Sequence, residues 1–154
     1  MKIKSVRAWL QNLALRKPYT IAHLVCSEVE NVFLEIELEN GIIGIGAANP
    51  APEVVGETPE QCLKNCQSEA FQRLTGCDIH NFRRLIAEIH QQFPHAPGTL
   101  AALDIALHDA CAQLGPETVS LPKAAVQPGR FISTVRAQVG LGLPLALMTP
   151  PSRP

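Results

Sequence analysis

The stretch Val29–Gly46 most constrains the fold, because its pattern is that of two strands joined by a tight turn. Apolar side chains in its first half share one parity and polar ones take the other, the period of a strand with one buried and one wet face. The apolar set is Val32, Leu34, Ile36 and Leu38. Asn40-Gly41 supplies the residue pair that a type I′ turn prefers, since both tolerate positive φ. Ile42–Gly46 then resumes an extended pattern, so the stretch predicts an antiparallel hairpin.

A further strand is expected before this hairpin, over Lys2–Leu15. Val6, Ala8 and Leu10 share one parity there, and Pro18 closes the run. After the hairpin, Asn49-Pro50-Ala51-Pro52 lacks helical periodicity, and its prolines remove backbone donors. That tract should be a loop that leaves a three-stranded meander.

Two amphipathic helices are expected next. Thr58-Pro59-Glu60-Gln61 places a capping hydroxyl before a proline and a glutamine at the third helical position, which is a capping box. The first helix should therefore run to about Leu74. Asp78 is expected to cap the second, which should end at Pro94. Its apolar residues recur at helical spacing: Phe82, Leu85, Ile86 and Ile89.

A third helix is expected after Pro97-Gly98, with Thr99 as its cap. It should be the most buried helix, because its body is almost wholly apolar. Beyond Leu114 prolines recur without a sustained amphipathic pattern, so residues 115–154 are expected to form a Pro-rich irregular tail. The sequence predicts an α+β domain over residues 1–114, an antiparallel three-stranded meander followed by a small helical bundle.

Composition excludes several classes of function. The formal charge is -1, with 13 basic and 14 acidic residues interspersed, so no field steers a nucleic acid toward the surface. The start of the chain carries charged residues and lacks the apolar run of a signal peptide or a membrane span. The 5 cysteines form an odd set, which argues against an obligatory disulfide framework. We expect a cytoplasmic protein with reduced thiols.

Most residues that could carry chemistry have simpler structural explanations. Cys62 and Cys66 would share a helical face, and without a second pair we expect two small buried side chains. Four histidines lack a ligand pattern and are expected at the surface or in caps: His80, His90, His95 and His108. Carboxylates near helix entrances are assigned to capping: Glu53, Glu57 and Glu60. Asp104 and Asp109 are expected to make buried hydrogen bonds or an interface. Turn chemistry is expected to explain three glycines: Gly41, Gly44 and Gly46.

Several local motifs together resemble one known family. Glu39-Asn40-Gly41-Ile42-Ile43-Gly44-Ile45-Gly46, followed by Pro50 and Gly56-Glu57-Thr58, is similar to the hairpin, loop and first-helix entry of the amino-terminal domain of the enolase superfamily, mandelate-racemase and muconate-lactonizing branch. Ala102-Leu103-Asp104-Ile105-Ala106-Leu107-His108-Asp109 resembles its late helix. The stretch Lys17-Pro18-Tyr19-Thr20-Ile21-Ala22-His23 and the Asn49–Pro52 loop most resemble dipeptide epimerases that act on Ala-Glu-like dipeptides.

The resemblance implies a function for an intact protein of this kind. Enzymes of the family abstract the proton α to a carboxylate, with a lysine base and with magnesium that stabilises the resulting enediolate. Those groups come from a barrel domain for which this chain shows no counterpart. The chain is therefore expected to supply no catalytic residue and no metal ligand. It would be the capping, substrate-specificity domain of a magnesium-dependent dipeptide epimerase-like isomerase, truncated and inactive alone, with the barrel domain as its partner.

By position, Tyr19–Leu24 and Ala48–Val55 match the two family loops that close over the barrel mouth. The resemblance implies substrate-binding residues in both loops: Tyr19, Thr20, Ile21, His23, Asn49 and Pro50. His23 matches a position where some dipeptide epimerases carry a cationic side chain that meets the distal carboxylate of the substrate. Leu24 and Ala47 depart from the family pattern, which commonly has a small residue and a glutamate there.

Two alternatives stay open. The shared scaffold also fits another reaction of the superfamily, such as cycloisomerisation or o-succinylbenzoate synthesis. A non-catalytic alternative is an oligomerising or partner-binding fragment, because the surface that would dock on the barrel is left exposed.

Overall fold

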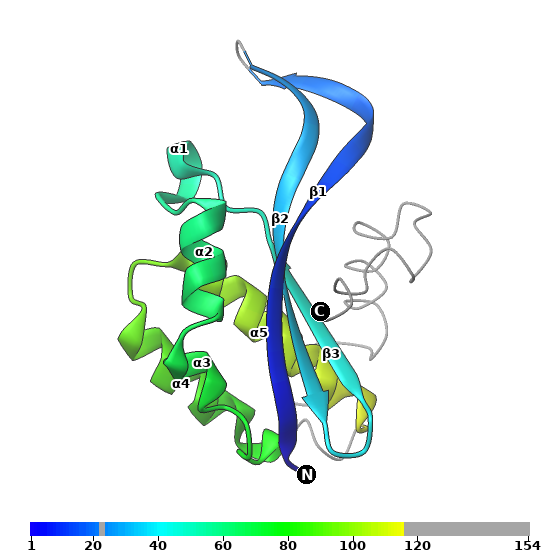
Figure 1. The fold of residues 1–154 in the computed structure, drawn as a ribbon, viewed down its shortest axis with the longest axis vertical. Helices are drawn as coiled ribbons and strands as arrows, with labels where there is room; N and C mark the ends of the chain where they lie inside the picture. Colours follow the sequence, from blue (N-terminus) through cyan, green and yellow to red (C-terminus); the bar gives the residue numbers. More distant parts are fainter. Residues whose placement is uncertain (22–23, 116–154) are drawn as a thin grey trace, which may run out of the picture.

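The computed structural model describes residues 1–21 and 24–115, with the backbone alone for residues 16–21 and 24–27. Three antiparallel strands form one sheet in the order β1-β2-β3: β1 (Ile3–Ile21), β2 (Leu24–Leu38) and β3 (Ile43–Ala48). The helices that follow are α1 (Pro52–Val55), α2 (Pro59–Cys66), α3 (Glu69–Gln72), η1 (Ile79–Asn81), α4 (Phe82–Gln92) and α5 (Pro97–Gln113). The helices gather on one side of the sheet, and the β1–β2 hairpin projects beyond it (Figure 1). This confirms the expected α+β meander with helices.

The core lies between the sheet and the helices. The predicted apolar set on β2 is fully buried there: Val32, Leu34, Ile36 and Leu38. Ile3 and Val6 of β1 join the same core although they differ in parity, because the pairing with β2 shifts between Ile3 and Ser5. The helices contribute Phe71, Leu85, Leu103 and Leu107, which are also fully or almost fully buried.

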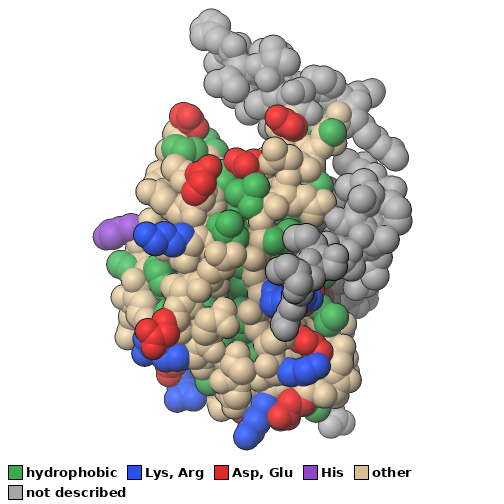
Figure 2. Space-filling model, in the orientation of Figure 1, with side chains coloured by type: hydrophobic (Ala, Val, Ile, Leu, Met, Phe, Trp, Pro, Cys, Tyr) green, Lys and Arg blue, Asp and Glu red, His purple; other side chains and the backbone are tan. Residues whose placement is uncertain are grey.

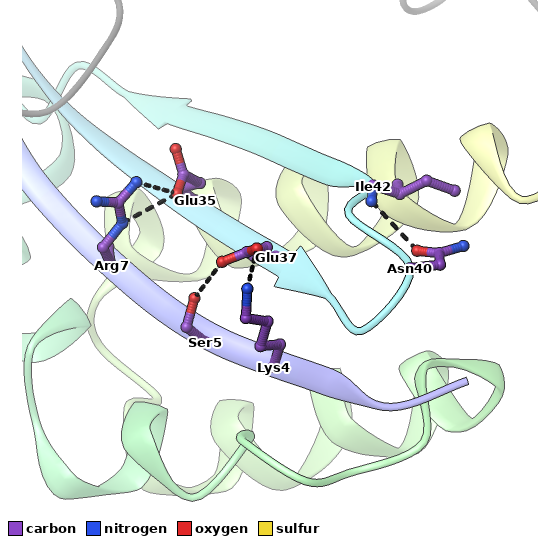
Figure 3. A network of polar contacts seen from close by, with 7 residues as sticks. All are labelled: Lys4, Ser5, Arg7, Glu35, Glu37, Asn40 and Ile42. Carbon is purple, nitrogen blue, oxygen red and sulfur yellow. Dashed lines mark hydrogen bonds and ion pairs between the residues drawn. The ribbon is translucent and has the colours of Figure 1, made fainter.

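The opposite face of β2 is not wet throughout, so that part of the expectation is wrong. Phe33 is 1% exposed and its ring stacks on Trp9 with 5.5 Å between the centroids. Glu35 is 5% exposed, and its Oε1 lies 2.6 Å from Nη2 of Arg7. Each residue thus contacts its cross-strand partner on β1, and Figure 3 shows this for Glu35 and Arg7.

The hairpin between β2 and β3 forms as expected, but its turn is one residue longer than a type I′ turn. The Leu38 amide donates to the Ile42 carbonyl at 2.8 Å, and the Gly41 amide donates to the Leu38 carbonyl at 2.9 Å. Gly41 has φ 85°, a left-handed conformation that glycine adopts without strain. This is the geometry of a three-residue loop with glycine in the left-handed position.

Strand β1 does not end before Pro18, contrary to the sequence expectation. It continues to Ile21 and pairs with β2 at Tyr19, Thr20 and Ile21. The pairing is irregular between Ala14 and Tyr19, the interval that contains Pro18. Proline lacks a backbone N–H and cannot donate to the ladder. A long strand can therefore contain a proline where its pairing is irregular.

The first expected helix forms as two shorter ones. Its capping box is present: the Gln61 amide donates to Thr58 Oγ1 at 3.2 Å and the Thr58 amide donates to Gln61 Oε1 at 3.0 Å. The helix α2 ends at Cys66, and α3 begins at Glu69 instead of the helix running unbroken to Leu74. Asp78 caps as expected, accepting a bond from the His80 amide at 3.1 Å, and the 3-10 turn η1 leads into α4.

Replacing Thr58 by alanine should remove this cap and lower the free energy of unfolding by about 1 kcal/mol. Urea denaturation would measure the loss. Thr75→Ala is the matched control, because Thr75 is an exposed threonine outside the helices and its replacement should cost no more than about 0.5 kcal/mol. Equal losses in the two variants would contradict a capping role for Thr58.

Helix α5 is the most buried helix, as expected, but it begins at Pro97 after Ala96, so Thr99 is not its N-cap residue. It packs directly against β3, and two glycines of β3 make that approach possible. A Cβ on Gly44 would lie 2.6 Å from the Ala110 amide nitrogen, and one on Gly46 would lie 2.8 Å from that of Ala106. Close helix–strand packing requires these two glycines, and the sequence interpretation as turn residues is wrong for both.

The outer edge of β3 is also covered by α5. Asp109 Oδ2 accepts a bond from the Ile45 amide at 3.0 Å, and Gln113 Nε2 donates to the Ile43 carbonyl at 2.7 Å. Asp109 thus makes the expected hydrogen bond, whereas Asp104 is exposed and faces His108. Side chains that satisfy an edge strand block its pairing with another chain. No helix in residues 1–21 and 24–115 is long and apolar enough to cross a membrane.

Candidate functional site

Two segments extend from the same end of the sheet. One is the far part of the β1–β2 hairpin, and the other is the connection after β3, which contains α1. Figure 1 shows both at the end opposite the N-terminus and the β2–β3 turn. Sequence analysis assigned substrate-binding residues to both segments, so this end of the molecule is the candidate functional site.

The structure places the residues of the first segment on the hairpin. Tyr19 pairs with Cys26, Thr20 with Val25 and Ile21 with Leu24, so the expected loop is mostly strand. His23 lies outside the described residues.

The residues of the second segment follow directly after β3. Asn49 is exposed and Pro50 is buried. Ala48 pairs with Val32, and Tyr19 pairs with Cys26, which lies six residues from Val32 along β2. Six extended residues span about 20 Å. The described part of the chain therefore puts the two sets at one end of the fold without joining them in one cluster.

The second segment contains a helical turn that the sequence analysis predicted as loop. In α1 the amides of Val54 and Val55 donate to the Ala51 carbonyl at 2.9 and 2.8 Å. Gly56 ends the turn with φ 70° and donates to the Pro52 carbonyl at 3.0 Å. None of the four α1 residues is buried, and Val54 is 82% exposed. The segment therefore presents a short ordered turn with an apolar side chain in solvent.

Glu57 anchors the end of this segment. Its carboxylate is 2% exposed and accepts bonds from the Gly98 amide at 2.8 Å and the Thr99 amide at 3.1 Å. The Thr99 hydroxyl also donates to it, and Asn65 Nδ2 donates at 3.3 Å. Glu57 thus caps α5, a helix 41 residues away, instead of the helix entrance beside it. This partner of Glu57 was not predicted from the sequence; the unsatisfied amides after Pro97 are the feature that could have indicated it.

The described charged side chains of residues 28–31 and 48–56 are all carboxylates: Glu28, Glu30 and Glu53. Acidic side chains gather at the upper end of the face shown in Figure 2. These carboxylates attract cationic ligands, and the same hairpin also carries Arg16 and Lys17, whose side chains lie outside the described part.

The buried thiols are shielded from solvent. Cys62 and Cys66 are fully buried, and the pKa of Cys66 is raised, because its hydrogen bond to Cys62 and its burial both disfavour the thiolate. Burial also raises the pKa of Cys111 to about 11. These cysteines are small core residues, as expected for Cys62 and Cys66.

Among the described residues there is no metal site and no buried lysine or histidine. No group of three or more His, Cys, Asp or Glu residues among them is arranged to hold a metal ion. The four histidines between His80 and His108 are exposed, in agreement with their assignment to the surface. The lysines whose side chains are described are exposed as well: Lys2, Lys4 and Lys64. The buried carboxylates Glu35 and Glu57 accept hydrogen bonds from Arg7 and from the first turn of α5.

Comparison with known proteins identifies close similarities. Residues 3–120 match the family model of the mandelate racemase / muconate lactonizing enzyme N-terminal domain. An L-Lys-D/L-Arg epimerase of Desulforapulum autotrophicum is 43% identical over 79% of this chain. An L-Ala-D/L-Glu epimerase of Thermotoga maritima is 35% identical over 73% of it. The chain spans about a third of each relative, 33% and 32% of their lengths.

A solved structure has the same fold over most of the chain. The dipeptide epimerase of Methylococcus capsulatus, crystallised with Mg and the dipeptide L-Arg-D-Lys, superposes with a TM-score of 0.71 at 34% sequence identity. The match covers 93% of this chain and 44% of that protein. The similarity thus extends from local motifs to the whole described fold.

Proposed function

Because the chain belongs to the mandelate racemase / muconate lactonizing enzyme N-terminal domain family, we propose that its residues 1–114 are the capping domain of a dipeptide epimerase, with residues 115–154 outside that domain. The observation that carries the proposal is the position of the two segments, which leave one end of the sheet together (Figure 1). A barrel domain, the partner in this proposal, supplies the lysine base and the magnesium site. The cytoplasmic location stays a prediction.

The capping role follows from what the described residues offer. The hairpin beyond Leu10 and the α1 segment lie at one end of the sheet, and no residue of α1 is buried. Both segments continue from strands that pack in the core. Segments of this kind close over a reaction centre, exclude water and contact the substrate. Residues proposed to contact the substrate come from both: Tyr19, Thr20, Ile21, His23, Asn49 and Pro50. The chain orients and selects the dipeptide, and proton transfer belongs to the barrel.

A cationic dipeptide is the proposed substrate class. The carboxylates of Glu28, Glu30 and Glu53 favour lysine and arginine side chains over acidic ones near the two segments. The relative from Desulforapulum autotrophicum is an L-Lys-D/L-Arg epimerase, which supports the same class. The Ala-Glu dipeptide suggested by the sequence motifs is the second candidate, favoured by the relative from Thermotoga maritima. Charge on the substrate side chain distinguishes the two.

The proposal predicts that the chain alone has no epimerase activity. Deuterium incorporation at the α-carbon of Lys-Arg and Ala-Glu dipeptides, followed by NMR with magnesium present, would measure it. The Methylococcus capsulatus enzyme serves as the positive control. Incorporation by the isolated chain above the buffer rate would refute the assignment of catalysis to a separate barrel.

A further inference from the structure

Glu57 links two parts of the fold that are far apart in sequence, and its position suggests a role beyond helix capping. It follows Gly56, the residue that ends α1, and its carboxylate lies at the first turn of α5. We propose that Glu57 is a positioning residue that pins the segment Asn49–Gly56 to the start of α5 and so holds α1 in one orientation. That Glu57 holds this segment on α5 does not depend on the proposed function. Any effect of Glu57 on substrate selection does rest on that function.

Both ends of the segment Asn49–Gly56 lie close to Gly98 of α5. A Cβ on Gly98 would lie 2.9 Å from Glu57 Oε2, 3.4 Å from the Pro50 Cβ and 3.7 Å from the Ala48 Cβ. Gly98 therefore lies beside residues on both sides of α1. A loop whose two ends meet on one rigid element loses little further entropy when its middle orders.

The hydrogen bonds that Glu57 accepts are charge-assisted and therefore strong. A carboxylate that accepts from backbone amides makes charge-assisted hydrogen bonds, and the amides at a helix start carry partial positive charge. Glu57 is 2% exposed, so water cannot readily replace these bonds. Asn65 Nδ2 also donates to Thr99 Oγ1 at 3.2 Å, which connects the cluster to α2.

The segment has few other means of keeping its shape. The residues of α1 are not buried, so the core does not hold the turn. Inside the turn, the amides of Val54, Val55 and Gly56 donate hydrogen bonds to carbonyls of the same segment. The acceptors are the carbonyls of Ala51 and Pro52. Hydrogen bonds of Glu57 to Gly98, Thr99 and Asn65 hold the end of the segment, and the buried Pro50 holds its start.

Amide hydrogen exchange on the 154-residue chain tests the proposal without any activity assay. Glu57→Gln keeps the shape of the side chain but removes its charge and one acceptor. Exchange at Val54, Val55, Gly56, Gly98 and Thr99 should then accelerate by about tenfold or more. Amides of the β2–β3 ladder, such as that of Leu38, should change by less than about twofold, because local openings are separable from global unfolding. Glu88→Gln, an exposed carboxylate on α4, is the matched control and should change none of these rates.

Exchange in Glu57→Gln that stays within about twofold of the wild type at the five amides would overturn the proposal. So would equal acceleration throughout the β2–β3 ladder, which indicates a general loss of stability. If Glu57→Gln fails to fold, the same exchange measurement on Thr99→Val tests the proposal. This variant removes the hydroxyl that donates to Glu57 and keeps the Thr99 amide. It should accelerate exchange at Val54–Gly56, and Thr99→Ser should restore protection; unchanged exchange in Thr99→Val overturns the proposal. Failure here leaves the epimerase assignment intact, and inactivity of an intact enzyme leaves the pinning intact.

Discussion

Gly46→Ala is expected to lower the free energy of unfolding by about 3 kcal/mol or more. The added Cβ would overlap the carbonyl oxygen of Ala102 and lie 2.8 Å from the amide nitrogen of Ala106. Both atoms belong to the backbone of α5, so neither can move aside as a flexible side chain would. Helix α5 must shift as a body, and that shift separates it from the buried strands β2 and β3.

Gly41→Ala is the control that separates steric overlap from loss of backbone freedom. Gly41 has φ 85°, but a Cβ there would meet nothing within 4 Å. The variant should therefore cost about 1 kcal/mol, the strain of a left-handed alanine. Urea denaturation of both variants gives the comparison. If Gly46→Ala costs no more than Gly41→Ala, β3 and α5 are not packed as closely as described.

The second large effect is expected in the core of α5. Leu103→Ala should lower the free energy of unfolding by about 3 kcal/mol, since a fully buried leucine leaves a cavity that its surroundings fill only in part. Ile105→Ala on the same helix is the matched control. Ile105 is half-buried, so its truncation should cost about 1 kcal/mol. Equal losses at the two positions in denaturant titrations would contradict the orientation assigned to α5.

Local sequence patterns were sufficient to predict where most strands and helices lie, because the spacing of apolar and capping residues follows the geometry of each element. The parity of Val32 and Leu34 predicted the buried face of β2, and Thr58 with Gln61 predicted the start of α2. The type of turn after Leu38 was not predictable in the same way. Asn-Gly suits loops of two or three residues, and the choice depends on the residue with which pairing resumes, here Ile42.

Long-range contacts account for what the sequence patterns did not predict. The ion pair of Glu35 depends on Arg7, which is 28 residues away, and the role of Glu57 depends on Gly98, which is 41 away. The need for glycine at position 46 arises from the backbone of α5, which no pattern around Gly46 describes. Such residues become recognisable only when the elements are packed together.

The two segments of the candidate site were predictable from the sequence, but their conformations were not. The resemblance assigned Asn49 and Pro50 to a loop, whereas the structure shows an ordered turn between them and Glu57. This difference matters for function, because an ordered turn contacts a ligand with less entropic loss than a flexible loop. His23, the other residue singled out for specificity, lies outside the described residues and its role stays a prediction.

The central claim is best tested by joining residues 1–114 to the barrel of the Methylococcus capsulatus dipeptide epimerase in place of its own amino-terminal domain. Deuterium incorporation at the α-carbon would be measured for Lys-Arg and Ala-Glu dipeptides, with that native enzyme as the control. The account predicts that the joined protein exchanges the α-proton, and that it exchanges the cationic dipeptide faster. A joined protein that folds, shown by circular dichroism, yet exchanges neither dipeptide would contradict the assignment of this chain as a capping domain.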